Sequence, residues 1–156
     1  MNNEQTFTDL VRRQRSNIYT VCYMFSNNQD EVNDLFQEVL IKLWQGYESF
    51  RGDSNERTWV YRVALNACIS IDRSKKSRSR HEAIISGVDL FDETDAKNQQ
   101  TEMLHNRILR LQPFDRAIVL LWLEDLSYEE IGEIVGITAK NVSVRLVRIR
   151  EQLKKS

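Results

Sequence analysis

The sequence contains few of the residues that interrupt helices or build disulfides and metal sites. Its 156 residues include one proline, five glycines, two cysteines and two histidines. Pro113 comes late in the chain, so every earlier segment is free to be helical. No apolar run approaches the roughly 20 residues of a membrane span, and we find neither a period-two strand pattern nor an internal repeat. These absences favour an all-α protein.

The cysteines, the histidines and the N-terminal residues exclude several classes of protein. Cys22 and Cys68 both fall on apolar helical faces, so we expect buried free thiols rather than a disulfide. The N-terminal MNNEQTFTDL lacks the basic and apolar regions of a secretory signal, and with free thiols this predicts a cytoplasmic protein. His81 and His105 are isolated, and the sequence has no metal-ligand spacing, glycine-rich phosphate loop or nucleophile elbow. We therefore expect no enzyme, no metal, no cofactor and no small-molecule substrate.

Basic and acidic residues are segregated along the chain, although the formal net charge is only -1. Residues 73–80 contain five bases and no acid, and residues 138–156 contain six bases against the single acid Glu151. Residues 124–133 contain five acids and no base. Two separate basic segments indicate two contacts with nucleic acid and leave other surfaces for protein. The alternative is that each charge run is simply a solvated face.

The C-terminal residues 126–155 have the pattern of a helix-turn-helix. Ser127 and Glu130 form a capping box that starts the first helix, and Gly136 supplies its left-handed stop. Thr138 caps a second helix with a basic outer face, which is typical of a helix that enters the DNA major groove. Its inner, apolar stripe consists of Val142, Leu146, Ile149 and Leu153. The alternative is a helical hairpin in an ordinary bundle.

Two long amphipathic helices are expected at the other end of the chain. The first spans residues 6–26 and is broken by the polar residues 26–28. The second starts at Asp30 and ends at Gly46, and a polar loop follows from Glu48 to Glu56. The second helix carries two adjacent apolar rows, which are Leu35, Val39 and Leu43, and Phe36, Leu40 and Trp44.

Residues 58–73 combine a core-facing row with a polar face. The polar face contains Arg62, Asn66, Ser70 and Arg73, flanked by Trp59 and Tyr61. Sites for single-stranded nucleic acid use rings to stack on bases, at about 1–3 kcal/mol per base, and cations to hold phosphates. In the alternative, the two rings finish the core and Arg62 lies over them. The spacing does not decide between these interpretations.

Residues 77–101 lose helical periodicity. Structureless loops beyond about 12–15 residues are uncommon in a compact domain, so we expect a linker at 78–101 between domains at 5–77 and 102–156. Pro113 starts a further helix, and residues 117–123 are apolar nearly all round, as at the centre of a second domain. The expected fold is two small helical domains joined by a flexible linker.

These segments together resemble a bacterial RNA polymerase sigma factor of the small, two-domain extracytoplasmic-function class. The similarity covers nearly the whole chain in order, apart from the linker. One block resembles the polymerase-binding helix: Asp34-Leu35, Gln37-Glu38-Val39 and Lys42-Leu43-Trp44. Another resembles the promoter-melting segment: Phe50-Arg51-Gly52-Asp53, Arg57-Thr58-Trp59, Tyr61-Arg62, Asn66-Ala67 and Ile71-Asp72-Arg73. The third resembles the C-terminal helix-turn-helix domain: Leu111, Pro113, Arg116, then Leu126 to Ile131 and Val135-Gly136-Ile137.

The resemblance implies a promoter-specificity subunit that binds core RNA polymerase, recognises minus-thirty-five and minus-ten promoter elements and helps to melt the DNA. One group would dock on the coiled coil of the polymerase clamp: Asp34, Gln37, Glu38, Leu43 and Trp44. A second would capture a flipped base of the minus-ten element and hold the single strand: Phe50, Arg51, Arg57, Trp59, Arg62, Asn66, Arg73, Lys75 and Lys76. A third would read the minus-thirty-five duplex: Thr138, Lys140, Asn141, Ser143, Val144, Arg145 and Arg148.

The chain departs from the family pattern in places. Relatives often have lysine and a small hydroxyl residue where this chain has Ser143 and Val144, which removes one donor and offers Val144 to a thymine methyl. Gly132 stands where alanine is commoner, which is expected to loosen the helix slightly. By the same resemblance we expect an anti-sigma factor, membrane-bound in many relatives, as a further partner. The alternative function is a two-domain helix-turn-helix repressor or activator that binds duplex DNA without polymerase.

Overall fold

Seven helices make up the described part of the chain in the computed structural model, which covers residues 3–50, 55–86 and 96–155. Side chains at position 3 and at positions 75–86 and 96–101 are outside the description. The helices are α1 (Asn3–Met24), α2 (Gln29–Phe50), α3 (Glu56–Ser86), α4 (Ala96–Leu109), α5 (Pro113–Leu123), α6 (Tyr128–Val135) and α7 (Ala139–Lys155). Every regular element in these ranges is helical, which confirms the all-α prediction.

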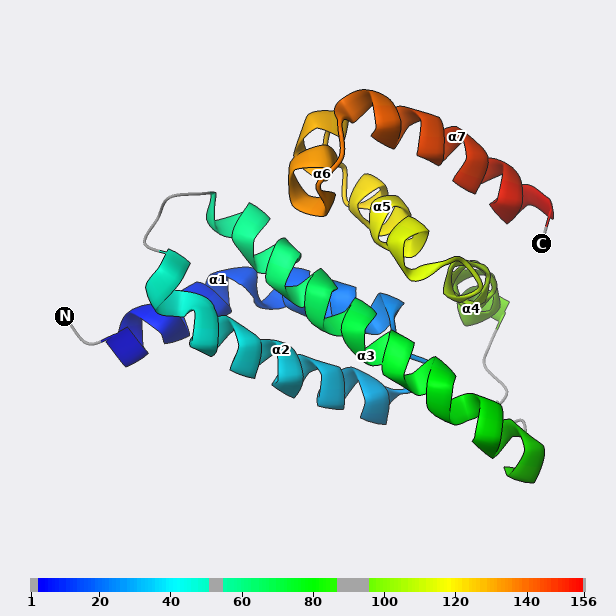
Figure 1. Cartoon of the computed structure of the whole chain (residues 1–156), viewed down its shortest axis with the longest axis horizontal. Helices are drawn as coiled ribbons and strands as arrows, with labels where there is room; N and C mark the ends of the chain where they lie inside the picture. Colours follow the sequence, from blue (N-terminus) through cyan, green and yellow to red (C-terminus); the bar gives the residue numbers. More distant parts are fainter. Residues whose placement is uncertain (1–2, 51–54, 87–95, 156) are drawn as a thin grey trace.

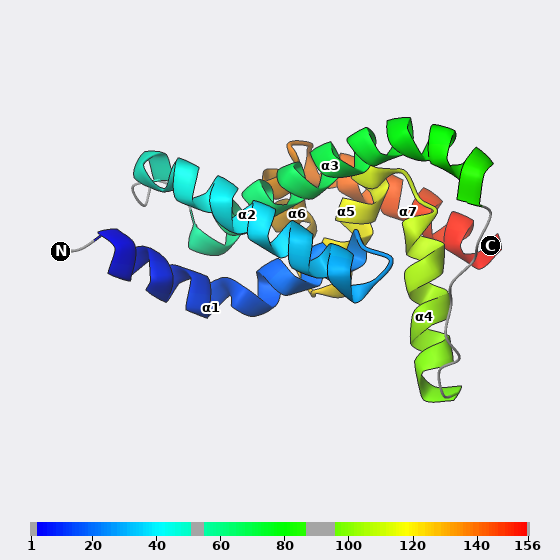
Figure 2. The same cartoon turned by 90° about the horizontal axis from the view of Figure 1, so that it is seen from below.

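Helices α1, α2 and α3 pack on one another in the N-terminal domain (Figures 1 and 2). Of the two apolar rows expected on α2, the row with Leu35, Val39 and Leu43 is buried, whereas Trp44 in the other row is 46% exposed. Cys22 and Cys68 are buried and free, as predicted. The hydrogen bond with the Cys22 thiol and burial raise the pKa of Cys68, so its thiol stays protonated and packs as a small apolar group.

The end of α2 differs from the prediction, because the helix continues through Gly46 to Phe50. A Cβ atom at Gly46 would lie 3.6 Å from Cζ2 of Trp59, so this glycine sits where α2 approaches the start of α3. The expected loop from Glu48 is therefore shorter, and α3 starts at Glu56. Glycine inside a helix costs only about 1 kcal/mol relative to alanine, so one glycine does not end α2.

The C-terminal domain is built around α5. Pro113 is at the first turn of α5, and the following residues Arg116–Leu121 are all buried. Ser127 and Glu130 form the expected capping box on α6, and Gly136 closes that helix with φ 85° in the left-handed region. Helix α7 packs its predicted stripe inward, with Val142, Leu146 and Ile149 buried. The helix-turn-helix expected from the sequence is therefore present.

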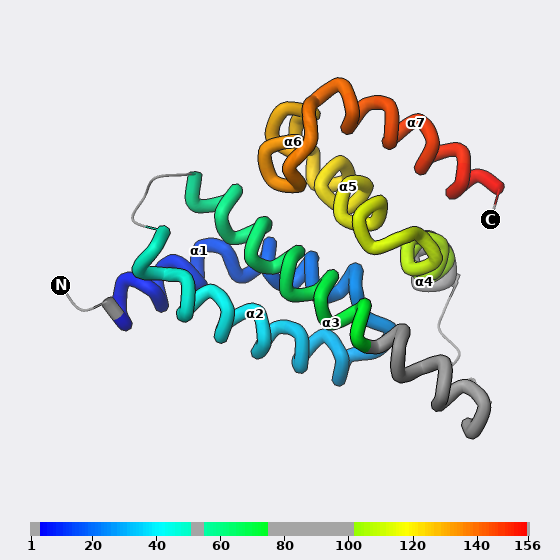
Figure 3. Tube along the Cα trace, viewed as in Figure 1, coloured from blue at the N-terminus to red at the C-terminus, as the bar shows by residue number. Residues whose placement is uncertain are grey.

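The two domains lie against each other, an arrangement that the sequence left open. Helix α3 packs on α1 and α2 and also contacts α5 and α6. The trace in Figure 3 shows α3 running between α2 and the C-terminal helices. Arg116 is the buried centre of this contact: its Cζ lies 4.8 Å from the centre of the Phe25 ring, and its Nη1 lies 3.4 Å from Oδ1 of Asp72. Burial lowers the pKa of Arg116, and Asp72 opposes that shift.

Helical structure also enters the range expected for the linker. Helix α3 continues to Ser86, and α4 begins at Ala96, so parts of residues 78–101 are helical. Residues 87–95 lie outside the described residues.

Candidate nucleic-acid and polymerase interfaces

The outer face of α7 presents the side chains expected to read duplex DNA. Thr138 caps the helix, because its Oγ1 accepts the backbone N–H of Asn141 at 3.1 Å. Lys140, Asn141 and Arg148 are exposed, and Val144 is 52% exposed, whereas Ser143 and Arg145 are half-buried. The helix therefore separates into a core face and an exposed face that carries amide and cationic side chains together with Val144 and Val147, a composition that suits contact with base edges in a major groove.

Gly132 allows the turn before α7 to close tightly. A Cβ atom at this position would lie 2.4 Å from the carbonyl oxygen of Ile137, closer than real Cβ contacts come. The carbonyl of Gly132 also accepts the backbone N–H groups of Gly136, at 2.8 Å, and of Ile137, at 3.0 Å. The missing side chain of Gly132 therefore leaves room for the turn that aims α7, a role that the helix propensity of glycine does not indicate.

Two residues that the sequence analysis missed hold Arg145 in place. Asp115 Oδ1 accepts Arg145 Nη1 at 3.1 Å, and the Arg145 Cζ lies 4.8 Å from the centre of the Phe114 ring. Both residues lie at the start of α5, and Asp115 is thirty positions before Arg145 in the sequence. No local pattern links positions so far apart, so only the fold reveals the contact.

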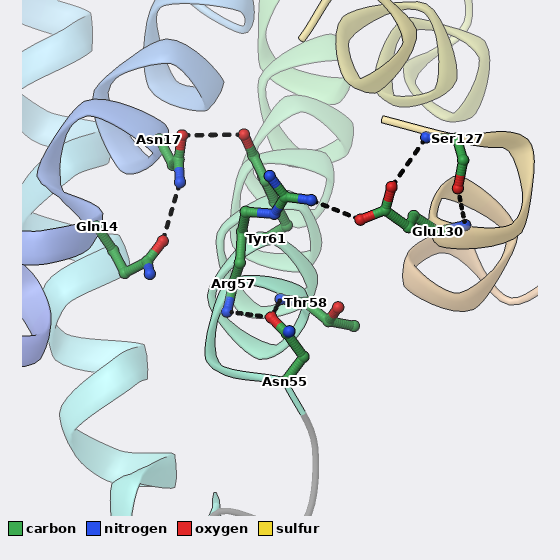
Figure 4. Close-up of polar contacts among 8 residues, drawn as sticks. All are labelled: Gln14, Asn17, Asn55, Arg57, Thr58, Tyr61, Ser127 and Glu130. Atoms are coloured by element: carbon green, nitrogen blue, oxygen red, sulfur yellow. Dashed lines mark hydrogen bonds and ion pairs between the residues drawn. The ribbon is translucent and has the colours of Figure 1, made fainter. Parts of the chain in front are cut away.

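The face of α3 expected to hold melted DNA carries both free and engaged side chains. Asn66 and Arg73 are exposed. Arg57 instead pairs with Glu130 on α6, and Nη2 of Arg62 donates to the Glu133 carbonyl at 2.8 Å. Figure 4 shows Arg57 extending from α3 to Glu130, which is held in turn by Ser127. The acidic segment 124–133 thus supplies the partners of two arginines assigned to promoter melting.

Glu130 has two roles at this contact. Its Oε1 accepts the backbone N–H of Ser127 at 3.0 Å, and its Oε2 pairs with Arg57. The hydrogen bonds with Ser127 and the nearby guanidinium lower the pKa of Glu130, so its carboxylate is charged across the physiological range.

The sequence left open whether the aromatic residues near the start of α3 stack on bases or complete the core, and Tyr61 and Trp59 differ in this respect. Tyr61 is 1% exposed and donates its hydroxyl to Asn17 Oδ1 at 3.0 Å, and burial raises its pKa to about 12, so it is a core residue. Trp59 is half-buried and stacks on Phe50 with ring centres 4.6 Å apart. Arg51 lies outside the described residues, and Lys75 and Lys76 lie on a part of α3 whose side chains are outside the description.

The proposed polymerase face of α2 keeps its polar members and loses one apolar member. Asp34 and Gln37 are exposed, and Glu38 is half-buried. Trp44 packs edge-on against Phe7, with ring centres 5.0 Å apart, and remains 46% exposed. Leu43 is 0% exposed, so its assignment to a partner surface is corrected: its row on α2 faces α1 and α3.

Two kinds of feature are not found among the described residues. None of the described helices is long and apolar enough to cross a membrane. In the same ranges, no three or more histidine, cysteine or carboxylate side chains group in a way that could hold a metal ion.

The two domains each match a family of known proteins. Sigma-70 region 2 matches residues 10–78, and sigma-70 region 4 matches residues 101–153. The chain belongs to the sigma-70 family. Sigma factors of this family are non-catalytic initiation factors that recognise promoters as subunits of RNA polymerase, and this sigma factor has the same function.

Relatives place the sigma factor in the extracytoplasmic-function class. It is 29% identical over 167 residues to the ECF RNA polymerase sigma factor SigW of Bacillus subtilis, covering 98% of this chain and 89% of SigW. It is also 29% identical to the RNA polymerase sigma factor YlaC of Bacillus subtilis, covering 100% of this chain and 94% of YlaC. The ECF RNA polymerase sigma-E factor of Haemophilus influenzae is 29% identical, with 97% of this chain and 87% of that protein covered.

Two solved structures share the fold. CnrH, in complex with the cytosolic domain of CnrY, superposes with a TM-score of 0.73 at 20% identity, covering 99% of this chain and 88% of CnrH. The sigma factor RpoE of Bartonella quintana, in complex with the anti-sigma factor NepR, gives a TM-score of 0.72 at 20% identity, covering 97% of this chain and 96% of RpoE.

Proposed function

We propose that α7 reads the minus-thirty-five element as duplex, that α3 and Phe50 hold the melted minus-ten strand, and that α2 docks on core polymerase. The observation that carries the proposal is the division of α7 between an inner face with buried Val142, Leu146 and Ile149 and an outer face with exposed Lys140, Asn141 and Arg148. These amides and cations lie on the second helix of a helix-turn-helix, directly after the left-handed turn at Gly136, where such proteins place the helix that enters the major groove. Thr138, Ser143, Val144 and Arg145 complete the proposed duplex-reading face.

The proposed single-strand site lies on the other domain. Asn66 and Arg73 are exposed on α3, and the stacked pair of Phe50 and Trp59 lies near its start. Extruding a base costs a few kcal/mol, which a shaped pocket with an amide and a ring offsets. Arg51, Lys75 and Lys76 are proposed to hold phosphates beside it.

Opening of the two domains belongs to the proposed mechanism. Arg57 and Arg62 are engaged by Glu130 and by the Glu133 carbonyl. These side chains reach a DNA strand only after α6 has moved away from α3. We propose that binding of core polymerase at α2 triggers this separation of α6 from α3, because α2 packs directly on α3.

Polymerase docking is proposed to use Asp34, Gln37, Glu38 and Trp44. Three of these are polar groups on the side of α2 away from its buried row, and Trp44 adds an exposed ring. An amphipathic helix that offers acids and an amide suits a basic partner helix. Because RNA polymerase acts in the cytoplasm, we place the sigma factor there. The complexes of CnrH with CnrY and of RpoE with NepR lead us to propose an anti-sigma factor as a further partner.

Gel shifts and run-off transcription with and without core polymerase test the proposal. We expect a promoter-specific transcript only with core polymerase, and we expect Arg148→Ala to weaken dependence on the minus-thirty-five element. Lys154→Ala removes the same charge from the end of α7 outside the proposed face, and it is the matched control. A duplex regulator would instead bind its site equally well without polymerase, and a missing transcript with active core would reject the proposal.

A further inference from the structure

We propose that Phe114 and Asp115 are positioning residues that hold Arg145 in the conformation that reads a guanine of the duplex promoter element. This inference rests on the duplex-reading role proposed for α7. It assigns one step of sequence discrimination to a unit that spans α5 and α7.

The guanidinium of Arg145 is held from two sides. Its Nη1 donates to Asp115 Oδ1 at 3.1 Å, and its Cζ lies 4.8 Å from the centre of the Phe114 ring. The Arg145 side chain is 41% exposed, whereas the Asp115 side chain is 21% exposed. The carboxylate is therefore largely covered, while part of the cation remains open to solvent.

The support beneath Arg145 is rigid. Pro113 fixes the first turn of α5, and Arg116–Leu121 are all buried in the domain core. Phe114 and Asp115 therefore stand on the first turn of a helix that is anchored in the domain core. A reading side chain supported by rigid elements is held more accurately than one supported by a loop.

The chemistry of the guanidinium leaves donors for DNA. The group carries five N–H donors in a planar fork, and Asp115 takes up an Nη1 donor while the ring contact uses none. Two parallel N–H bonds to O6 and N7 of guanine are the commonest specific contact of arginine in the major groove. Ordering the long side chain before DNA arrives removes a cost of about 2–10-fold in affinity.

A second stacked pair offers an internal comparison. Arg150 lies over Trp122, with its Cζ 5.2 Å from the ring centre, and so also joins α7 to α5. Arg150 lies outside the face proposed to read DNA. The two arginines thus share the packing role, and we assign the base contact to Arg145 because it lies nearer the N-terminus of α7, the end of a recognition helix that meets the bases.

Asp115 also gives the unit an electrostatic signature. A carboxylate beside the groove repels DNA phosphates of any sequence. Its removal is therefore expected to weaken binding to the correct element while leaving binding to unrelated DNA unchanged or tighter. A residue that only stabilised the domain would lower both together.

The test measures binding of the complete sigma factor with core polymerase to promoters that differ singly at each base pair of the minus-thirty-five element, and to a scrambled element. We expect Asp115→Ala to weaken binding to the correct element about 2–10-fold, without loss on the scrambled one. Asp115→Ala should also reduce the preference for guanine at the same base pair at which Arg145→Ala reduces it. Phe114→Tyr keeps the ring and should retain the preference, whereas Phe114→Leu should lose part of it.

The double variant decides whether Asp115 acts through Arg145. We expect Asp115→Ala with Arg145→Ala to match Arg145→Ala alone, because coupled residues are not additive. Additive losses, a uniform loss on all sequences, or the same reduction in guanine preference by the control Arg150→Ala would overturn the inference. Thermal unfolding of each variant identifies losses caused by misfolding. If the wild type shows no base preference at this element, the proposed function itself fails. If Arg145→Ala loses the preference but Asp115→Ala keeps it, only this inference fails.

Discussion

Arg57 on α3 and Glu130 on α6 pair across the boundary between the two domains, and Glu130 also completes the capping box of its own helix. One carboxylate thus links the fold of the helix-turn-helix to the position of the domain that we propose holds the melted strand. Both side chains are more than two-fifths exposed, at 44% and 43%. Such an exposed pair contributes only about 0–1 kcal/mol, so it biases the closed arrangement rather than locking it.

Glu130→Gln is expected to shift the domains toward separation while leaving α6 intact. Glutamine still accepts the backbone N–H of Ser127, but it no longer attracts Arg57. The distance between labels placed on α2 and α7, followed by single-molecule fluorescence transfer, measures the shift. Ser127→Ala is the matched control, because it removes part of the cap and leaves the ion pair. A larger separation in Ser127→Ala than in Glu130→Gln would contradict this role for the charge.

Gly132→Ala is expected to destabilise the C-terminal domain by about 1–3 kcal/mol, because its Cβ would meet the Ile137 carbonyl oxygen at 2.4 Å. Helix propensity alone predicts the opposite, a gain of about 1 kcal/mol. Gly46→Ala is the control, because its Cβ would be 3.6 Å from Trp59, an ordinary contact. Urea unfolding measures both free energies. Equal gains at the two glycines would show that the turn does not need Gly132.

His105 is expected to make stability depend on pH. Its ring stacks on Tyr23 with centres 4.3 Å apart, and its Nε2 lies 2.9 Å from the Tyr23 carbonyl oxygen, which joins α4 to α1. Burial lowers the pKa of His105 below its ordinary value of 6.5, and the Tyr23 carbonyl partly opposes that shift. Below pH 6.5 the unfolded chain therefore binds more protons than the folded one, so the free energy of unfolding falls with falling pH.

The pH prediction is checked by urea unfolding of the wild type and of His105→Gln across the range below neutrality. The variant lacks the titrating ring, so its free energy of unfolding should change less between neutral and mildly acidic pH. Identical slopes for both proteins would exclude His105 as the source.

Leu43 and Trp44 are neighbours with opposite expected effects. Leu43→Ala removes a fully buried side chain and should lower the free energy of unfolding by about 2–5 kcal/mol. Trp44→Ala removes a ring that is 46% exposed, so it should weaken binding to core polymerase with less effect on stability. Urea unfolding and a titration with labelled core polymerase separate the two. Unchanged polymerase affinity in Trp44→Ala would remove that residue from the docking surface.

Local chemistry explains which features the sequence predicts. The capping box at Ser127, the stop at Gly136 and the inner stripe of α7 depend on neighbours within a few positions, and each is present in the structure. The role of Gly46 depends on Trp59, and the role of Gly132 depends on the path of the turn after it. Neither partner is visible from helical spacing, so one glycine was expected to end a helix and the other to loosen one.

Contacts between distant segments explain the rest. The sequence around Arg62 is compatible with a contact to DNA, to a ring or to the Glu133 carbonyl. Only the docking of α6 on α3 shows that Arg62 contacts the carbonyl. The same holds for Asp115 beside Arg145, which lie on different helices. Polar surface side chains carry no periodic signal of their own, so their partners follow from the fold.

Run-off transcription on a promoter that is already melted tests the division of labour between α3 and α7 most directly. Core polymerase is combined with wild type, Asn66→Ala or Arg145→Ala on two templates, one fully paired and one with a mismatched bubble at the minus-ten element. We expect both variants to fail on the paired template, and the bubble to restore transcription by Asn66→Ala much more than by Arg145→Ala. Equal rescue of both variants, or of neither, would contradict the account.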